Sequence, residues 1–121
     1  QLAIGVEAIS ERRGEAAVET FTRIIERLPD FAEGWNKRAT VYYLAGDYQK
    51  SLADCDEVVK RNPQHFGAIS GYGQIYFRLE QYDKAIEYWR RALEVNPNML
   101  GVELNIKGAE QLLKEKRGRA I

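Results

Sequence analysis

The sequence predicts an all-α protein built from a repeated pair of antiparallel helices. Two observations lead to this prediction. The three prolines, Pro29, Pro63 and Pro97, stand 34 residues apart, and the apolar residues between them recur every three or four positions, as on one face of an amphipathic helix. A fixed period of this length is typical of repeat proteins whose helical units stack on one another.

Small residues follow the same 34-residue register as the prolines. One set is Gly5, Ala39 and Gly73, and a second is Ala17, Ser51 and Ala85. Turn residues interrupt the apolar pattern at Ala45-Gly46-Asp47 and at Arg61-Asn62-Pro63, so each period reads as a helix, a short turn and a second helix. The expected helices are 1–12, 15–28, 31–45, 48–61, 65–79, 82–95 and 99–116.

Each proline is followed by a residue that can begin the next helix. Asp30 has Glu33 three positions later, which is the spacing of a capping box. Gln64 and Asn98 stand at the equivalent positions of the next two periods, and Gln64 is the weaker cap of the two.

The composition is that of a globular protein, with 45% hydrophobic and 30% charged residues among 121. Because 18 basic residues balance 18 acidic ones, the chain lacks the positive surface of a nucleic-acid binder. No apolar run approaches the roughly 18 residues of a transmembrane helix, so we expect a soluble protein. The single cysteine, Cys55, can form no internal disulfide, which fits a reducing compartment such as the cytoplasm.

A 34-residue helix-turn-helix unit with small, aromatic and proline positions in this order resembles the tetratricopeptide repeat (TPR). The signature positions of one repeat are occupied by Trp35, Ala39, Tyr42, Ser51, Cys55, Val58 and Pro63. Those of the next are occupied by Ile69, Gly73, Tyr76, Ala85, Trp89, Ala92 and Pro97. The resemblance implies a TPR solenoid, that is, a right-handed superhelix of antiparallel helix hairpins. It also implies that Gly73 is small so that two helices can pack closely.

The resemblance divides the chain, taken as one domain, into four parts. Residues 1–30 form a truncated repeat whose opening residues would precede Gln1, residues 31–64 and 65–98 form complete repeats, and residues 99–121 form a capping helix and tail. Lys107 stands where a small residue is expected, and a polar outer face of this kind is typical of a terminal cap.

In the family that the chain resembles, the first helix of each repeat lines a concave groove. We expect this groove to bind a segment of a partner protein, because clustered exposed apolar area marks binding surfaces. Its expected residues are Asn36, Lys37, Thr40, Tyr43, Ser70, Gly71, Gln74, Phe77, Arg78 and Asn105. Tyr43 and Phe77 would supply apolar contacts, and the polar members would supply hydrogen bonds and charge. The alternative is that helix 99–116 folds over the groove and fills part of it.

The expected function is a non-enzymatic adaptor without metal or cofactor. His65 is the single histidine, so no metal-ligand cluster is expected, and we interpret it as a capping or surface residue. The run Gly71-Tyr72-Gly73 lacks the third glycine and the preceding strand of a dinucleotide-binding motif. The alternative function is a constitutive subunit of an oligomer or larger complex that contacts its neighbours through the N-terminal edge formed by Leu2, Val6 and Ile9.

Some members of the family grip the C-terminal carboxylate of heat-shock chaperones with Lys, Asn and Arg side chains. One register of equivalent positions gives Leu2, Val6, Lys37, Gly67 and Gly71, and the other gives Asn36, Thr40, Gly71, Gly101 and Asn105. Because these positions lack the cations that make such a grip strong, we expect a partner other than a chaperone tail held by a carboxylate clamp.

The C-terminal segment 114–119, Lys-Glu-Lys-Arg-Gly-Arg, is locally basic. It is interpreted as a complement to the helix dipole, with contact to an acidic partner or a membrane headgroup as the alternative. The segments "FAEGWNKRAT" and "GAISGYG" are similar to sequences of small repeat proteins of bacteria and plastids. A bacterial or a plastid compartment is therefore possible besides the cytoplasm.

Overall fold

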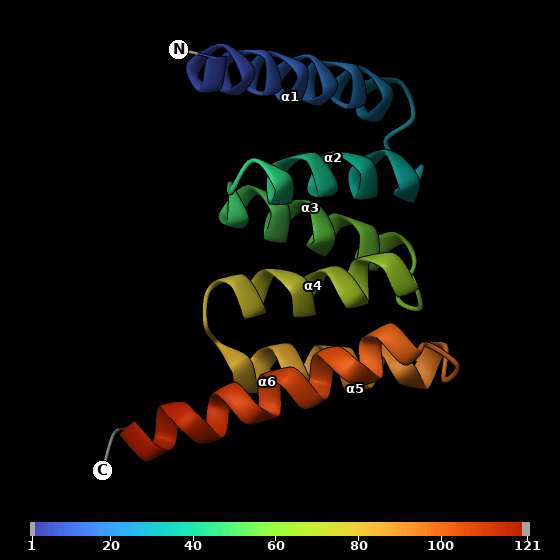
Figure 1. Cartoon of the computed structure of the whole chain (residues 1–121). Helices are drawn as coiled ribbons and strands as arrows, with labels where there is room; N and C mark the ends of the chain where they lie inside the picture. The colour runs from blue at the N-terminus through green and yellow to red at the C-terminus, as the bar shows by residue number, and fades with distance from the viewer. Residues whose placement is uncertain (1, 120–121) are drawn as a thin grey trace. The chain divides into compact units, whose positions relative to one another are not determined.

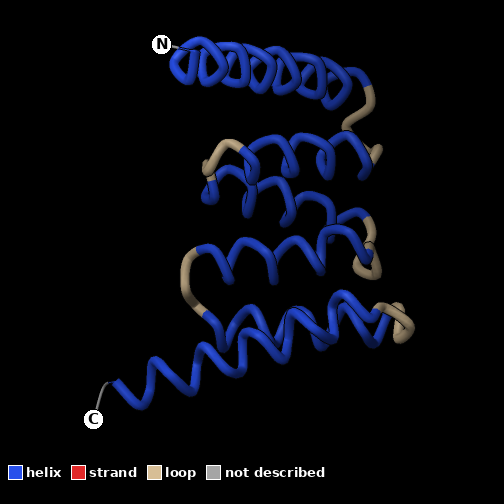
Figure 2. Tube along the Cα trace, in the orientation of Figure 1, coloured by secondary structure: helices blue, strands red, loops and turns tan. Residues whose placement is uncertain are grey.

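A computed structural model describes residues 2–119 as six α-helices with no strand, and their side chains from residue 11 onward (Figure 1, Figure 2). The all-α class and the helix hairpins predicted from the sequence are thereby confirmed. The chain forms two compact units, Gln1–Pro63 and Gln64–Ile121. Each unit is described by itself.

The first unit contains α1 (Leu2–Arg27), α2 (Ala32–Leu44) and α3 (Tyr48–Arg61). Helix α2 packs against both α1 and α3. The turn between α2 and α3 depends on Gly46, whose φ of 81° lies in the left-handed region that favours glycine. The backbone N–H of Asp47 donates to the carbonyl of Tyr42 (2.9 Å), and the rings of Tyr43 and Tyr48 meet across the turn at 5.8 Å.

The second unit contains α4 (Phe66–Arg78), α5 (Tyr82–Val95) and α6 (Leu100–Arg119), with α5 packed against both of the others. Its first turn repeats the construction of the α2–α3 turn. Glu80 takes the left-handed φ of 59°, the N–H of Gln81 donates to the carbonyl of Tyr76 (2.9 Å), and the rings of Phe77 and Tyr82 meet at 5.5 Å. The 34-residue period of the sequence is therefore also a period of turn geometry.

The expected break between helices 1–12 and 15–28 is wrong, because α1 runs without interruption through 26 residues. Gly14 occupies the position that Tyr48 and Tyr82 hold in the later repeats, so this segment has no ring with which to close a turn. A single glycine costs a helix only about 1 kcal/mol, and its neighbours are good helix formers. Helix α1 therefore continues through Gly14, where an added Cβ would meet nothing within 4 Å.

Two helix starts lie one residue after the expected caps. Phe31 rather than Asp30 is the N-cap of α2, and it makes no side-chain capping bond. His65 rather than Gln64 is the N-cap of α4, where its Nδ1 accepts a hydrogen bond from the N–H of Ala68 at 3.1 Å. The single histidine thus has the capping role that was one of its two interpretations.

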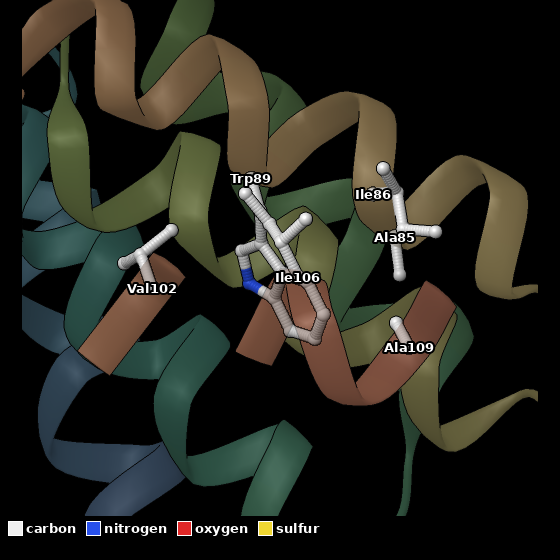
Figure 3. Close-up of a cluster of buried hydrophobic side chains, with 6 residues drawn as sticks. All are labelled: Ala85, Ile86, Trp89, Val102, Ile106 and Ala109. Atoms are coloured by element: carbon white, nitrogen blue, oxygen red, sulfur yellow. The ribbon is translucent and has the colours of Figure 1, made fainter. Parts of the chain in front are cut away.

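The core of the second unit is centred on Trp89, which is 1% exposed and packs with buried residues of α5 and α6 (Figure 3). The members of this cluster are Ala85, Ile86, Trp89, Val102, Ile106 and Ala109. Helix α4 reaches the same indole through Gly73, where a Cβ would lie less than 3.0 Å from three atoms of the ring. The expectation that Gly73 permits close packing is confirmed.

In the first unit a partly buried ion pair connects three helices. The Nε and Nη2 atoms of Arg38 on α2 each donate to the Asp54 carboxylate of α3 at 2.8 Å, and Nη1 donates to the hydroxyl of Thr22 on α1 at 3.1 Å. The side chains of Arg38 and Asp54 are 17% and 5% exposed. The carboxylate raises the pKa of the Arg38 guanidinium, chiefly through their hydrogen bonds.

The loop between α1 and α2 is connected to α2 and α3 through a single carbonyl. The carbonyl oxygen of Pro29 accepts hydrogen bonds from the Trp35 indole (2.9 Å) and from Nε of Arg61 (2.6 Å). The guanidinium of Arg61 also lies over the Trp35 ring, 4.7 Å from its centroid. The signature tryptophan therefore fixes the entry of the chain into α2.

We expect Gly73→Ala to destabilise the protein by about 1–3 kcal/mol, because the new methyl group overlaps the rigid indole of Trp89. Gly108→Ala is the matched control, since a Cβ at Gly108 meets nothing within 4 Å and alanine favours a helix over glycine by up to about 1 kcal/mol. Urea unfolding followed by circular dichroism measures both changes. Equal effects of the two substitutions would contradict this account of the α4–α5 contact.

We expect Asp54→Ala to lower the free energy of unfolding by about 2 kcal/mol, because it leaves the partly buried Arg38 charge without its partner, at a cost below that of a fully buried pair. Glu19→Ala is the control: Glu19 pairs with Arg23 at 3.9 Å, and both side chains are more than two-thirds exposed, so the loss should stay below about 1 kcal/mol. Chemical denaturation of the two variants tests this, and a similar small loss in both would show that the buried pair contributes little.

Candidate partner-binding surface

Four of the expected groove residues lie on α2, in the first unit. Lys37 and Thr40 are exposed, whereas Asn36 and Tyr43 are half-buried. The side-chain amide of Asn36 donates to Oε1 of Glu33 at 2.6 Å, and the Thr40 hydroxyl donates to the carbonyl of Asn36 at 3.1 Å. These bonds hold the polar stripe of α2 in one arrangement, with the ammonium of Lys37 directed to solvent.

Five more expected residues lie on α4, in the second unit. Ser70, Gly71 and Gln74 are half-buried and Arg78 is exposed. Five other residues of the helix are buried, namely Ala68, Ile69, Tyr72, Gly73 and Ile75. Helix α4 thus leaves a narrow strip of small and amide side chains accessible.

Phe77, the fifth of these residues, contributes much of its ring to the core of the unit. Its centroid lies 5.7 Å from the Trp89 ring and 5.5 Å from the Tyr82 ring. Truncating Phe77 would therefore destabilise the hairpin itself. The sequence interpretation, which gave this ring mainly to a partner, did not account for the aromatic contact across the turn.

The last expected residue, Asn105, is exposed on α6 between two open glycines. A Cβ at Gly101 or Gly108 would meet nothing within 4 Å, and Leu104 beside them is 56% exposed. The opposite side of α6 packs on α5 through Val102, Ile106 and Ala109. Helix α6 therefore lies along α5 (Figure 1), whereas the alternative drawn from the sequence had it folding over the groove.

The structure brings the expected residues together in two sets. Asn36, Lys37, Thr40 and Tyr43 share α2, while the remaining six belong to α4 and α6 of the second unit. The proposed N-terminal contact edge of Leu2, Val6 and Ile9 lies where side chains are outside the described part of the chain.

Two further features bear on the chemistry that the chain can perform. Within the described residues, no three His, Cys, Asp or Glu side chains are grouped so that they would hold a metal ion. In the same part of the chain, every helix is too short or too polar to cross a membrane.

Cys55 is buried on α3 at 2% exposure. Burial, and to a lesser extent the negative charges of Asp54 and Asp56, together raise the pKa of its thiol to about 12. A thiol in this state is a weak nucleophile, because the thiolate is the reactive form. Cys55 thus behaves as a small apolar core residue, as its place in the repeat suggests.

Two polar features of the structure were not predicted from the sequence. The Arg38–Asp54 pair joins residues that are 16 positions apart and that no motif connects. A groove between α5 and α6, lined in part by Arg90 and Glu110, comes from residues that read in the sequence as an ordinary solvated face. Only the basic run at the end of α6 pointed to this side of the unit.

Comparison with known proteins places the chain among repeat proteins. The tetratricopeptide repeat family model matches residues 32–65 and 73–99. A TPR repeat-containing protein of Rhizobium etli is 37% identical over 91 residues, which cover 75% of this chain and 45% of that protein. Hsp70-Hsp90 organizing protein 1 of Glycine max is 28% identical over 115 residues, covering 94% of this chain and 20% of that protein. The chain thus spans less than half the length of these curated relatives.

A solved structure has the same fold. The first TPR of Spaghetti (RPAP3), bound to the HSP90 peptide SRMEEVD, superposes with a TM-score of 0.80 at 21% identity and covers 93% of this chain and 89% of that chain. At this level of identity the likeness shows the fold, which is that of a TPR helical repeat domain.

The exclusion of chaperone tails as partners, made from the sequence, is wrong in view of these comparisons. A structure of this fold holds an HSP90 peptide, and relatives are named Hsp70-Hsp90 organizing proteins. The exclusion considered only the Lys and Arg positions of the carboxylate clamp.

We expect Cys55 to resist Ellman's reagent at pH 8 in the folded protein and to react at once in denaturant. An unfolded thiol titrates near 8.5, so the folded state keeps its proton in the range between that value and about 12. For the same reason the unfolded chain loses its proton first as the pH rises above about 8.5, and this group then lowers folding stability. Absorbance at 412 nm in native buffer measures the reaction, and rapid labelling there would contradict the burial of Cys55.

Proposed function

Because the chain belongs to the tetratricopeptide repeat family, we propose that it is a non-enzymatic adaptor that binds a peptide segment of a partner on the first helices of its repeats. The family consists of protein-interaction modules, and the structure of the same fold named above holds a short acidic peptide. The family and the bound peptide support a protein-binding function. The residues of this chain that contact the partner are our proposal.

One observation favours the first helices over other surfaces. On α2 and α6 several exposed residues are polar or lack a side chain: Lys37 and Thr40 on α2, and Gly101, Asn105 and Gly108 on α6. Leu44 on α2 and Leu100 and Leu104 on α6 are exposed as well and add apolar area to these helices. Backbone without covering side chains lets an extended segment approach closely. The amide side chains can then bond to the peptide groups of that segment.

Charge and polarity define the kind of segment that fits. Lys37 in the first unit, and separately Arg78 in the second, would pair with an acidic side chain or with a C-terminal carboxylate through charge-assisted hydrogen bonds. Gln74 and Asn105 would bond to the backbone of the segment. Docking of a single short segment typically gives micromolar affinity, about −8 kcal/mol.

The peptide SRMEEVD is the first probe, because a structure of the same fold holds it. We expect fluorescence anisotropy to give a micromolar Kd for the intact chain, and Lys37→Gln and Asn105→Ala each to weaken binding several-fold. Lys107→Gln is the control, since Lys107 is equally exposed but lies on a different side of α6 from Asn105.

The proposal fails if the peptide binds all four proteins equally, or if it binds none of them at millimolar concentration. Unchanged thermal unfolding of the variants is required in each case. This is expected because the three substituted side chains are exposed in the structure.

A further inference from the structure

A groove of about 480 Å³ runs between α5 and α6 in the second unit. Its floor is apolar: Ile86 of α5 is 6% exposed, and Leu113 of α6 is half-buried beside it. Its rim carries only charged side chains. A concave site with an apolar floor and a few polar groups at its edge has the general form of a ligand site.

The charges on the rim are unevenly distributed. At one end Nη2 of Arg90 pairs with Oε2 of Glu110 across the groove at 3.1 Å. At the other end Asp83 lies in the first turn of α5, where its carboxylate accepts a hydrogen bond from the N–H of Lys84 at 2.9 Å. Lys114 and Arg117 stand at this end too, and neither forms an ion pair within residues 11–119. The rim therefore keeps an excess of positive charge next to the apolar floor.

The basic end of α6 extends this excess beyond the groove. Lys116 and Arg119 follow in the last turn, and Glu115 is the single acid of the segment 114–119. The Nζ atom of Lys116 donates to the carbonyl of Glu80 at 3.4 Å. This bond connects α6 to the turn before α5.

The α5–α6 groove is separate from the surface proposed above. Asn105 and Lys114 are nine residues apart on α6, as are Gly108 and Arg117. Nine residues are two and a half turns of an α-helix, so the members of each pair project from opposite sides. A ligand on one side of α6 leaves the other side open.

We propose that the α5–α6 groove binds an acidic peptide segment that carries leucine-type side chains. The carboxylates of the segment pair with Lys114 and Arg117, and an apolar side chain covers Ile86 and Leu113. This is a second binding surface, and it goes beyond the adaptor function proposed for the first helices.

The rim favours a peptide over a membrane surface. A membrane of anionic lipid presents a broad sheet of negative charge, which the carboxylates of Asp83 and Glu110 on the same rim would repel. A peptide can place its acids against the two cations and avoid those carboxylates. The apolar floor also lies between charged edges, where a single side chain can reach it.

The test uses the full chain and a fluorescein-labelled peptide, Asp-Glu-Leu-Asp-Glu-Leu-Asp, blocked at both ends. We expect Lys114→Gln with Arg117→Gln to weaken binding about fivefold, as two partly exposed ion pairs would. Replacing both leucines of the peptide by serine should weaken it at least about tenfold, because apolar burial is lost. Lys107→Gln, two turns from Lys114 on the same helix, should leave the affinity within about twofold.

Four outcomes would overturn the inference. Equal weakening by Lys107→Gln would show unspecific charge attraction, and indifference to the leucines would show that the floor is unused. Binding to phosphatidylserine vesicles in place of the peptide, lost in the Lys114→Gln, Arg117→Gln double variant, would assign the basic end to a membrane. Loss of peptide binding in Asn105→Ala would place the peptide on the opposite side of α6 and would leave the adaptor proposal intact.

Discussion

Close approach of the two helices within each hairpin is the contact on which the rest of the structure depends. It is achieved by matching sizes at two positions. In the first unit Ala39 on α2 and Cys55 on α3 are both small to medium and both buried. In the second unit Gly73 has lost even its Cβ, and the partner position holds the large indole of Trp89. The side-chain volume is divided differently between the two positions in the two hairpins, but the helices pack closely in both.

This constraint also decides which faces remain for binding. A first helix whose small residue is buried against its partner must turn its opposite side to solvent, because side chains three and four positions apart share a face. Lys37 is two positions from Ala39, which places it on the opposite side of α2, and it is exposed for this reason. Helix α6 has no following helix among the described residues, so both of its free sides are accessible, and two different surfaces result.

Much of the fold was predictable from the sequence because period, proline positions and small residues all act locally. The bounds of α3 and α5 agree with the expected helices to the residue. The uninterrupted α1 was not predictable from the period alone, because a turn needs its closing contact as well as its register. Tyr48 and Tyr82 supply that contact, while Gly14 cannot. The residues of the candidate surface could be listed from the sequence, but the role of each could not. Phe77 packs in the core because its ring meets that of Trp89, which is 12 positions away in the sequence.

The repeat position held by the Arg38–Asp54 pair in the first unit is held by Tyr72 and Tyr88 in the second, where the rings stack at 4.7 Å. An ion pair thus joins α2 to α3, whereas stacked aromatic rings join α4 to α5. The penalty for removing charges from water falls on heating, while the gain from apolar burial levels off. The contribution of the charged pair and that of the stacked rings are therefore expected to change differently with temperature, although both occupy the same positions of the repeat.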